Sequence, residues 1–189
     1  YRKKMYITGG IGSTRMNEGF TFDYDLPNET AYAETCAAIG LVCWSHRLLH
    51  LECDRKYADV LERALYNGVI SGISLDGKKF FYDNPLASLG KVHRKEWFNV
   101  SCCPPNIARL LASLGQYVYS QSETDLIVHL YLQGSVRFSN GDQEITLYQK
   151  GNYPWDGNIS IELEMEHPQI FGLKLRIPGW AQEATLRVN

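Results

Sequence analysis

The spacing of apolar residues changes near residue 122, and this change divides the 189-residue chain into two parts. Before it, apolar residues recur mainly at helical intervals, whereas after it they alternate with polar residues, as in half-buried strands. We therefore expect residues 35–120 to be mostly helical and residues 124–189 to form mostly antiparallel strands. The predicted fold class is mixed, mainly α and then β, with domains at 1–121 and 122–189.

Three helices are predicted in the first part. Residues 35–51 are apolar almost all round, which is typical of a helix buried between neighbours. Residues 54–70 carry apolar side chains on one face and begin at Asp54, a residue type that favours the N-cap. The third helix is predicted at residues 105–120.

Short strands and turns account for the remaining periodic segments. A turn at 76–77 leads into a predicted short strand at 79–82. After residue 122 the expected strands lie within residues 126–132, 136–138, 145–147, 159–165 and 173–177. Several short strands joined by close turns favour an antiparallel β-sandwich.

Composition excludes several classes of partner. The formal net charge is -2, with no long run of Lys or Arg, so we expect neither nucleic acid nor a membrane surface as a partner. No apolar stretch reaches the roughly 18 residues needed to cross a bilayer. We expect a cytoplasmic location. The chain begins at Tyr1 rather than Met, and we interpret it as a piece of a longer protein.

Cys102 and Cys103 are adjacent thiols at the predicted start of the third helix. A disulfide prefers Cα atoms about 4.4–6.8 Å apart, whereas neighbouring Cα atoms lie only about 3.8 Å apart, so a bridge between them would be strained. A metal ion needs only two sulfurs on one centre. The positive end of a helix also favours the thiolate. These cysteines are therefore the first candidate functional residues.

Glu34 and Cys36 lie two positions apart, a spacing whose meaning depends on the local backbone. On a regular helix their side chains would point about 200° apart and could not reach one ion. In extended geometry they would lie on one side, with Thr35 capping a helix that begins at Cys36. The alternative is that Glu34 is a solvated carboxylate on a longer helix starting near Asn28. Together with the two adjacent cysteines, the pair could complete a tetrahedral zinc site.

Other candidate residues carry weaker signals. Glu18 lies in an aromatic stretch that could raise a carboxyl pKa, as suits a general acid. His46 and His50 have the i, i+4 spacing of a metal-binding pair but no supporting framework. The glycines within residues 9–12 lack the Lys of a phosphate-binding loop, so we interpret them as allowing a tight loop.

Five segments match one enzyme family in order along nearly the whole chain, namely residues 6–13, 18–28, 31–37, 102–106 and 175–180. These segments resemble the β-L-arabinofuranosidases of glycoside hydrolase family 127. The resemblance implies the C-terminal part of an (α/α)6 barrel followed by the start of an antiparallel β-sandwich. Because such a barrel would be incomplete, apolar faces of the helix at 35–51 should be exposed or covered by a second copy, as in a homo-oligomer.

The resemblance also implies roles for single residues. The family's zinc ligands match one carboxylate and three thiols: Glu34, Cys36, Cys102 and Cys103. Cys102 matches the nucleophilic cysteine, Glu18 the general acid/base, and Tyr82 a tyrosine near the sugar. The implied activity is a glycosidase that cleaves terminal β-L-arabinofuranosides, a small-molecule carbohydrate substrate, with retention. Most of the barrel is missing, so the piece is not assumed to be active alone.

Two further functions stay open on the sequence. The zinc could be purely structural, because four protein ligands close a site and leave no open position for chemistry. The chain could otherwise be a non-catalytic carbohydrate-binding domain that uses Trp97, Trp155 and Trp180 as stacking surfaces. The last two lie in the predicted sandwich, where tryptophans are more often part of the core.

Overall fold

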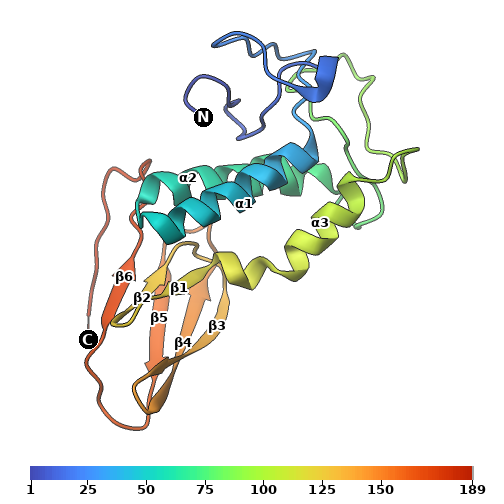
Figure 1. Cartoon of the computed structure of the whole chain (residues 1–189). Helices are drawn as coiled ribbons and strands as arrows, with labels where there is room; N and C mark the ends of the chain where they lie inside the picture. Colours follow the sequence, from blue (N-terminus) through green and yellow to red (C-terminus); the bar gives the residue numbers. More distant parts are fainter. Residues whose placement is uncertain (189) are drawn as a thin grey trace. The chain divides into compact units, whose positions relative to one another are not determined.

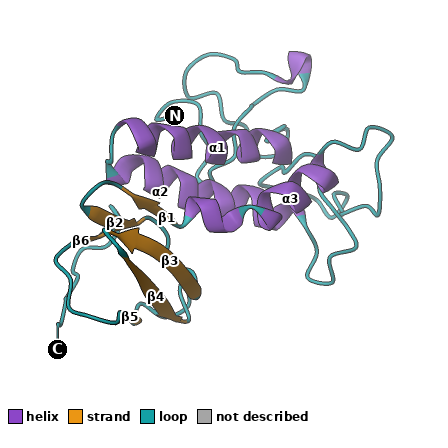
Figure 2. Cartoon of the chain, turned by 60° about the horizontal axis from the view of Figure 1, so that its bottom comes forward, coloured by secondary structure: helices purple, strands orange, loops and turns teal. Residues whose placement is uncertain are grey.

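The computed structural model describes residues 1–188, which fall into two compact units (Figure 1). The first unit is Tyr1–Ala112, and the second begins at Ser113. Among the described residues, the helices α1–α3 belong to the first unit and the strands β1–β6 to the second (Figure 2). The helix-then-strand order predicted from the periodicity is therefore confirmed.

Helix α1 spans Thr35–Leu51 and follows a residue with non-helical backbone angles, Glu34 (φ -59°, ψ 138°). The predicted helix is confirmed, and the alternative of a longer helix starting near Asn28 is wrong. Thr35 is not the cap: it is the first helical residue, and its hydroxyl donates to the Phe81 carbonyl over 3.0 Å. Glu34 thus occupies the N-cap position, outside the helix as expected.

Helix α1 buries one face and exposes the other. Ala38, Val42 and Leu49 are buried, and α1 packs against both α2 and α3. Trp44 and Leu51 are exposed, at 63% and 83%. Exposed apolar side chains on this helix agree with the expectation, and their coverage by a second copy stays a prediction.

Helix α2 spans Arg55–Arg63 and is capped as predicted, because the Asp54 side chain accepts from the Lys56 amide over 2.9 Å. The chain continues through a π-helical turn, Ala64–Val69, and a 3-10 turn, Ile70–Gly72. These turns extend the helical segment to the length predicted from the sequence.

The segment between Gly72 and Cys103 is not helical, so residues 35–120 are helical only in part. The strand predicted at 79–82 is wrong, because only Phe80 forms isolated bridges there, with Ile73 and Lys95. Helix α3 spans Cys103–Ala112 and is shorter than predicted. It ends before Ser113, whose φ of -108° and ψ of 8° lead into a separate 3-10 turn, Leu114–Tyr117.

The second unit contains two three-stranded sheets. The first has the order β1-β2-β6, with bounds Tyr119–Gln121, Asp125–Val128 and Gly172–Leu175. The second has the order β3-β4-β5, with bounds Gly134–Asn140, Gln143–Gly151 and Ile159–Glu164. Each strand predicted after residue 122 is present in at least part of its range. Pairing is antiparallel except between β2 and β6, which run parallel, contrary to the prediction.

The two sheets share one apolar cluster. Leu126 and Val128 of β2 lie in it together with Ile145 and Leu147 of β4. Their alternate positions on each strand explain the period of two in the sequence. The barrel and sandwich descriptions go beyond these elements and stay predictions.

The tryptophans of the second unit are not core residues, contrary to expectation. Trp155 and Trp180 are 85% and 61% exposed. Both lie in turns outside the strands, where the alternation that directs side chains into the core does not operate. Trp180 instead stacks on Tyr153, with ring centroids 6.5 Å apart. In the described part of the chain, no helix is both long and apolar enough to cross a membrane.

Candidate metal centre and active site

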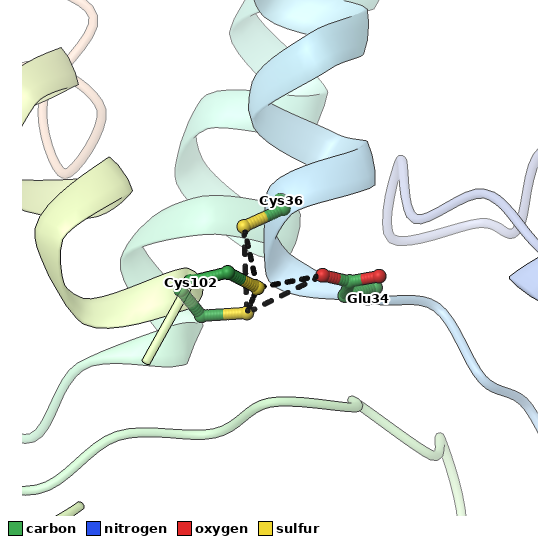
Figure 3. A group of neighbouring side chains, drawn as sticks. Glu34, Cys36 and Cys102 are labelled. Carbon is green, nitrogen blue, oxygen red and sulfur yellow. Dashed lines mark hydrogen bonds between the residues drawn. The ribbon is translucent and has the colours of Figure 1, made fainter. Parts of the chain in front are cut away.

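Four side chains predicted as metal ligands converge on one point (Figure 3). The ligand atoms of Glu34, Cys36, Cys102 and Cys103 all lie within 4.8 Å of one another. The three sulfur–sulfur distances are 3.4, 3.5 and 3.5 Å, and Glu34 Oε1 lies 3.1 Å from Cys102 Sγ. Sulfurs about 2.3 Å from a tetrahedral ion would lie about 3.8 Å apart, so only a small expansion separates this cluster from zinc geometry.

The cluster is built from the starts of two helices. Glu34 is the N-cap of α1 and Cys36 its second residue, so the i, i+2 pair spans the change from extended to helical backbone. Cys102 precedes α3, whereas Cys103 is its first residue and not outside the helix as predicted. Both helix N-termini direct partial positive charge at the site, which favours anionic ligands.

The two adjacent cysteines differ in accessibility. Cys103 is fully buried, whereas Cys102 and Cys36 are partly exposed. The five cysteines of the chain, all within the described residues, are free thiols. Cys102 is therefore the member of the pair that an incoming molecule can reach.

The thiols do not ionise equally in this arrangement. The pKa of Cys36 is lowered to about 6, chiefly by its hydrogen bond with Cys103 and also by one with Asn106. Burial raises the pKa of Cys102 to about 11, and the hydrogen bond with Cys36 raises that of Cys103. Full ionisation of the set would need a nearby positive charge, which a divalent metal provides. One carboxylate and three sulfurs form a donor set that fits zinc.

Tyr82 lies against the cluster. Cys102 Sγ lies 3.2 Å from Tyr82 Oη, and the hydrogen bond between them, with burial, raises the pKa of Tyr82. The Tyr82 ring packs between those of Tyr32 and Phe98, with centroids 6.4 and 5.5 Å away. Tyr82 is thus fixed beside the more accessible thiol.

Glu18 is exposed and lies outside the four-residue cluster. Its backbone is left-handed, with φ of 49°, and its Oε1 accepts a 3.1 Å hydrogen bond from Tyr32 Oη. Burial, followed by the charges of Glu34 and Glu18, raises the pKa of Tyr32, so this hydroxyl remains a donor. Because Tyr32 also contacts Tyr82, an aromatic pair links Glu18 to the residue that touches Cys102.

Sequence reasoning missed Tyr32 and Asn106. Tyr32 lies two positions before Glu34 and carries the Glu18 contact, while Asn106 stabilises the Cys36 thiolate. Both lie inside the segments that resemble the family, close in sequence to the candidate ligands, and this position was the only signal that could have identified them. Their partners depend on long-range packing, which spacing alone does not predict.

Two other candidates do not join the site. His46 and His50 lie with Nε2 atoms 3.2 Å apart, and among the described residues no third ligand completes a metal-binding group with them. The glycine segment packs against the π-helical turn: a Cβ at Gly9 would lie 2.7 Å from the Ala64 nitrogen. Close packing in a tight loop therefore explains the glycine at this position, as interpreted from the sequence.

Comparison with known proteins agrees with the resemblance. The family model for the β-L-arabinofuranosidase GH127 catalytic domain matches residues 1–116, and that for the GH127 middle domain matches residues 125–189. A curated non-reducing end β-L-arabinofuranosidase from Bifidobacterium longum subsp. longum is 41% identical over 206 residues. The match covers 99% of this chain and 30% of that protein.

Solved structures give the same result. A GH127 β-L-arabinofuranosidase from Geobacillus stearothermophilus T6 superimposes with a TM-score of 0.91 at 52% identity, over 96% of this chain and 30% of that one. A second GH127 β-arabinofuranosidase gives 0.88 at 51% identity, over 94% and 28%. The chain therefore spans about 30% of the length of such relatives. Since the catalytic-domain model matches more than half of its residues, the chain belongs to the β-L-arabinofuranosidase family, GH127.

Proposed function

We propose that the protein hydrolyses terminal β-L-arabinofuranosides with retention, with Cys102 as nucleophile and Glu18 as general acid/base. The observation that carries this proposal is the convergence of one carboxylate and three thiols around a partly exposed cysteine, in a chain of this family. The relatives' names supply the sugar, and the geometry supports the nucleophile.

Glu34, Cys36, Cys102 and Cys103 would together hold a zinc ion. When bound, the ion supplies the positive charge that keeps the thiols deprotonated at neutral pH. Cys103 and the N-cap residue Glu34 are both buried, so they can hold the ion without being needed for contact with the substrate.

In the first half of the reaction, Cys102 Sγ attacks the anomeric carbon of the sugar. The bond from that carbon to the leaving oxygen breaks with its electron pair, and Glu18 gives its proton to that oxygen. The sugar is then held on the Cys102 sulfur as a thioglycoside, with inverted configuration.

In the second half, the Glu18 carboxylate takes a proton from water as the water oxygen attacks the same carbon. The carbon–sulfur bond breaks and its electron pair returns to Cys102 as a thiolate. The second inversion restores the original configuration, so the product retains the β-anomer.

Tyr82 would serve beside the reacting sulfur. Its raised pKa keeps the hydroxyl protonated, so Oη can donate to a Cys102 thiolate or to a sugar hydroxyl. We also propose residues 1–121 as the end of the (α/α)6 barrel and residues 122–189 as the opening of a β-sandwich.

The test uses the full-length protein and a synthetic aryl β-L-arabinofuranoside. We expect zinc to copurify with it, the first-formed product to be the β-anomer by NMR, and a slow substrate to label Cys102 by mass spectrometry. An α-anomer product would refute retention. Stoichiometric zinc without hydrolysis or labelling of Cys102 would instead favour the purely structural site.

A further inference from the structure

The chain makes an unusual turn directly before Glu34, one of the four proposed metal ligands. Ala33 is buried and has φ of 38°, a left-handed conformation that is unfavourable for a residue with a Cβ. The backbone then becomes extended at Glu34 and helical at Thr35. Such a conformation persists only where surrounding contacts hold it.

Asn84 makes contacts on both sides of Glu34. Its side-chain Nδ2 donates to the Ala33 carbonyl over 2.9 Å and to Thr35 Oγ1 over 3.0 Å. Its backbone amide donates to the Tyr32 carbonyl over 3.2 Å. One residue, about fifty positions along the chain, therefore contacts three of the residues that flank the ligand.

The orientation of the Asn84 amide follows from its partners. Thr35 has a single hydroxyl proton, which it donates to the Phe81 carbonyl, so Thr35 Oγ1 must accept from Asn84. The Ala33 carbonyl is an acceptor as well. Both contacts therefore require the NH₂ group, and a carboxylate of the same shape could not replace it.

The Ala33 carbonyl belongs to the same peptide plane as the Glu34 nitrogen. Holding that carbonyl fixes the rotation on either side of the plane, and hence the direction in which the Glu34 side chain leaves the backbone. We infer that Asn84 is a positioning residue for the metal centre, which keeps the Glu34 carboxylate directed at the three sulfurs. This inference rests on the metal site of the proposed function.

The test is zinc affinity in the full-length protein, measured by competition with a chromophoric chelator. Removal of partners that orient a ligand typically lowers metal affinity about 10–100-fold. We expect Asn84→Ala to fall in this range and Asn84→Asp to lose more, because it places negative charge against the Ala33 carbonyl. A packing role alone would give the opposite order, since Asp preserves the shape of Asn.

Val60→Ala is the matched control. Val60 is buried in α2, so its truncation should lower the unfolding temperature and leave zinc affinity within about twofold, which is well below the loss expected of an orienting residue. Circular dichroism checks that each variant is folded at the titration temperature.

Each other outcome overturns the inference. Unchanged affinity in both Asn84 variants would exclude a positioning role while leaving the proposed function intact. Loss of folding in both, with Val60→Ala folded, would make Asn84 a residue of the fold and not of the metal centre. Absence of zinc binding by the unmodified protein would remove the proposed metal site and this inference together.

Discussion

Among single residues, the two adjacent cysteines illustrate how one peptide bond separates two environments. Cys103 begins α3 and is fully buried, whereas Cys102 precedes the helix and contacts Tyr82. We expect Cys102→Ser to lower turnover by at least about a thousandfold, because an alcohol is a much weaker nucleophile than a thiolate at neutral pH. Cys103→Ser should first lower zinc occupancy, and activity only as a consequence.

Steady-state kinetics and metal analysis of both variants in the full-length protein distinguish these roles. If Cys102→Ser keeps near-normal activity while Cys103→Ser is inactive with zinc still bound, Cys103 and not Cys102 is the nucleophile. Activity in both variants would exclude the thiol mechanism.

Glu18 provides a second prediction about a single residue. Glu18→Gln should reduce kcat/KM strongly for alkyl arabinofuranosides and less for nitrophenyl ones, because a nitrophenolate leaves without a proton. The control is Glu29→Gln, an exposed carboxylate nearby in the sequence, which should leave both rates unchanged. Equal losses on the two substrates would argue against a general acid role.

Cys36 makes the stability of the metal-free protein depend on pH. Its pKa is lowered from the ordinary 9.0 to about 6, so the folded state binds fewer protons than the unfolded state between these values. Stability should therefore rise from pH 6 to pH 9, and the contribution is lost as pH falls through 6. Above pH 9 the raised pKa of Cys102 acts in the opposite direction.

Urea unfolding with a chelator present measures this effect. Cys36→Ser should lose the rise between pH 6 and 9, since it lacks the group that titrates there. A variant with the same pH dependence as the unmodified protein would contradict the assignment to Cys36.

The candidate site shows which residues a sequence can identify. The four candidate ligands could be proposed because two thiols are adjacent, the other pair lies at a predicted helix start, and all four match the ligands of the family that the sequence resembles. Spacing alone left open that Glu34 is a solvated carboxylate. Asn84 and Tyr32 could not be identified in this way, because their roles depend on contacts with residues that only folding brings near. The Asn84 amide, for example, contacts Ala33 across 51 positions.

Between elements, the close approach of the glycine segment to the π-helical turn gives a prediction about stability. Gly9 has φ of 85°, and a Cβ there would lie 2.7 Å from the Ala64 nitrogen. Gly9→Ala should destabilise the fold by roughly 2–4 kcal/mol, from backbone strain and overpacking together. Gly77→Ala is the control, with φ of 72° but no atom within 4 Å of a Cβ, and should cost about 1 kcal/mol.

Chemical denaturation of the two variants separates these contributions. Equal losses would show that backbone conformation alone matters at Gly9 and that the contact with Ala64 does not.

Element types were more predictable than their ends and partners. The periodicity of α1 and α2 is a local property, and both helices were predicted correctly, although the N-cap of α1 is Glu34 and not Thr35. The end of α3 at Ala112 and the parallel pairing of β2 with β6 are not local. The pairing of β2 with β6 joins strands more than forty residues apart. An alternating pattern of apolar residues is the same for parallel and antiparallel neighbours, so it does not predict the direction of pairing.

For the whole molecule, all four proposed zinc ligands belong to the first of the two compact units. Zinc at a hundred times its dissociation constant should stabilise that unit by about 2.7 kcal/mol. Hydrogen exchange measured by mass spectrometry should therefore show slower exchange in α1 and α3 on zinc addition, with β3, β4 and β5 unchanged. Equal protection of the strands would show that the two units open together.

The order in which the ligands are synthesised has a consequence for how such a centre is assembled. Cys36 and Cys102 are 66 positions apart, so the ribosome releases half of the ligand set well before the other half. At about 5–20 residues per second, the delay is roughly 3–13 s. During this interval the nascent chain carries only Glu34 and Cys36 of the four proposed ligands. Complete metal loading can only follow the emergence of α3, and a ribosome stalled earlier would hold a half-site open to oxidation.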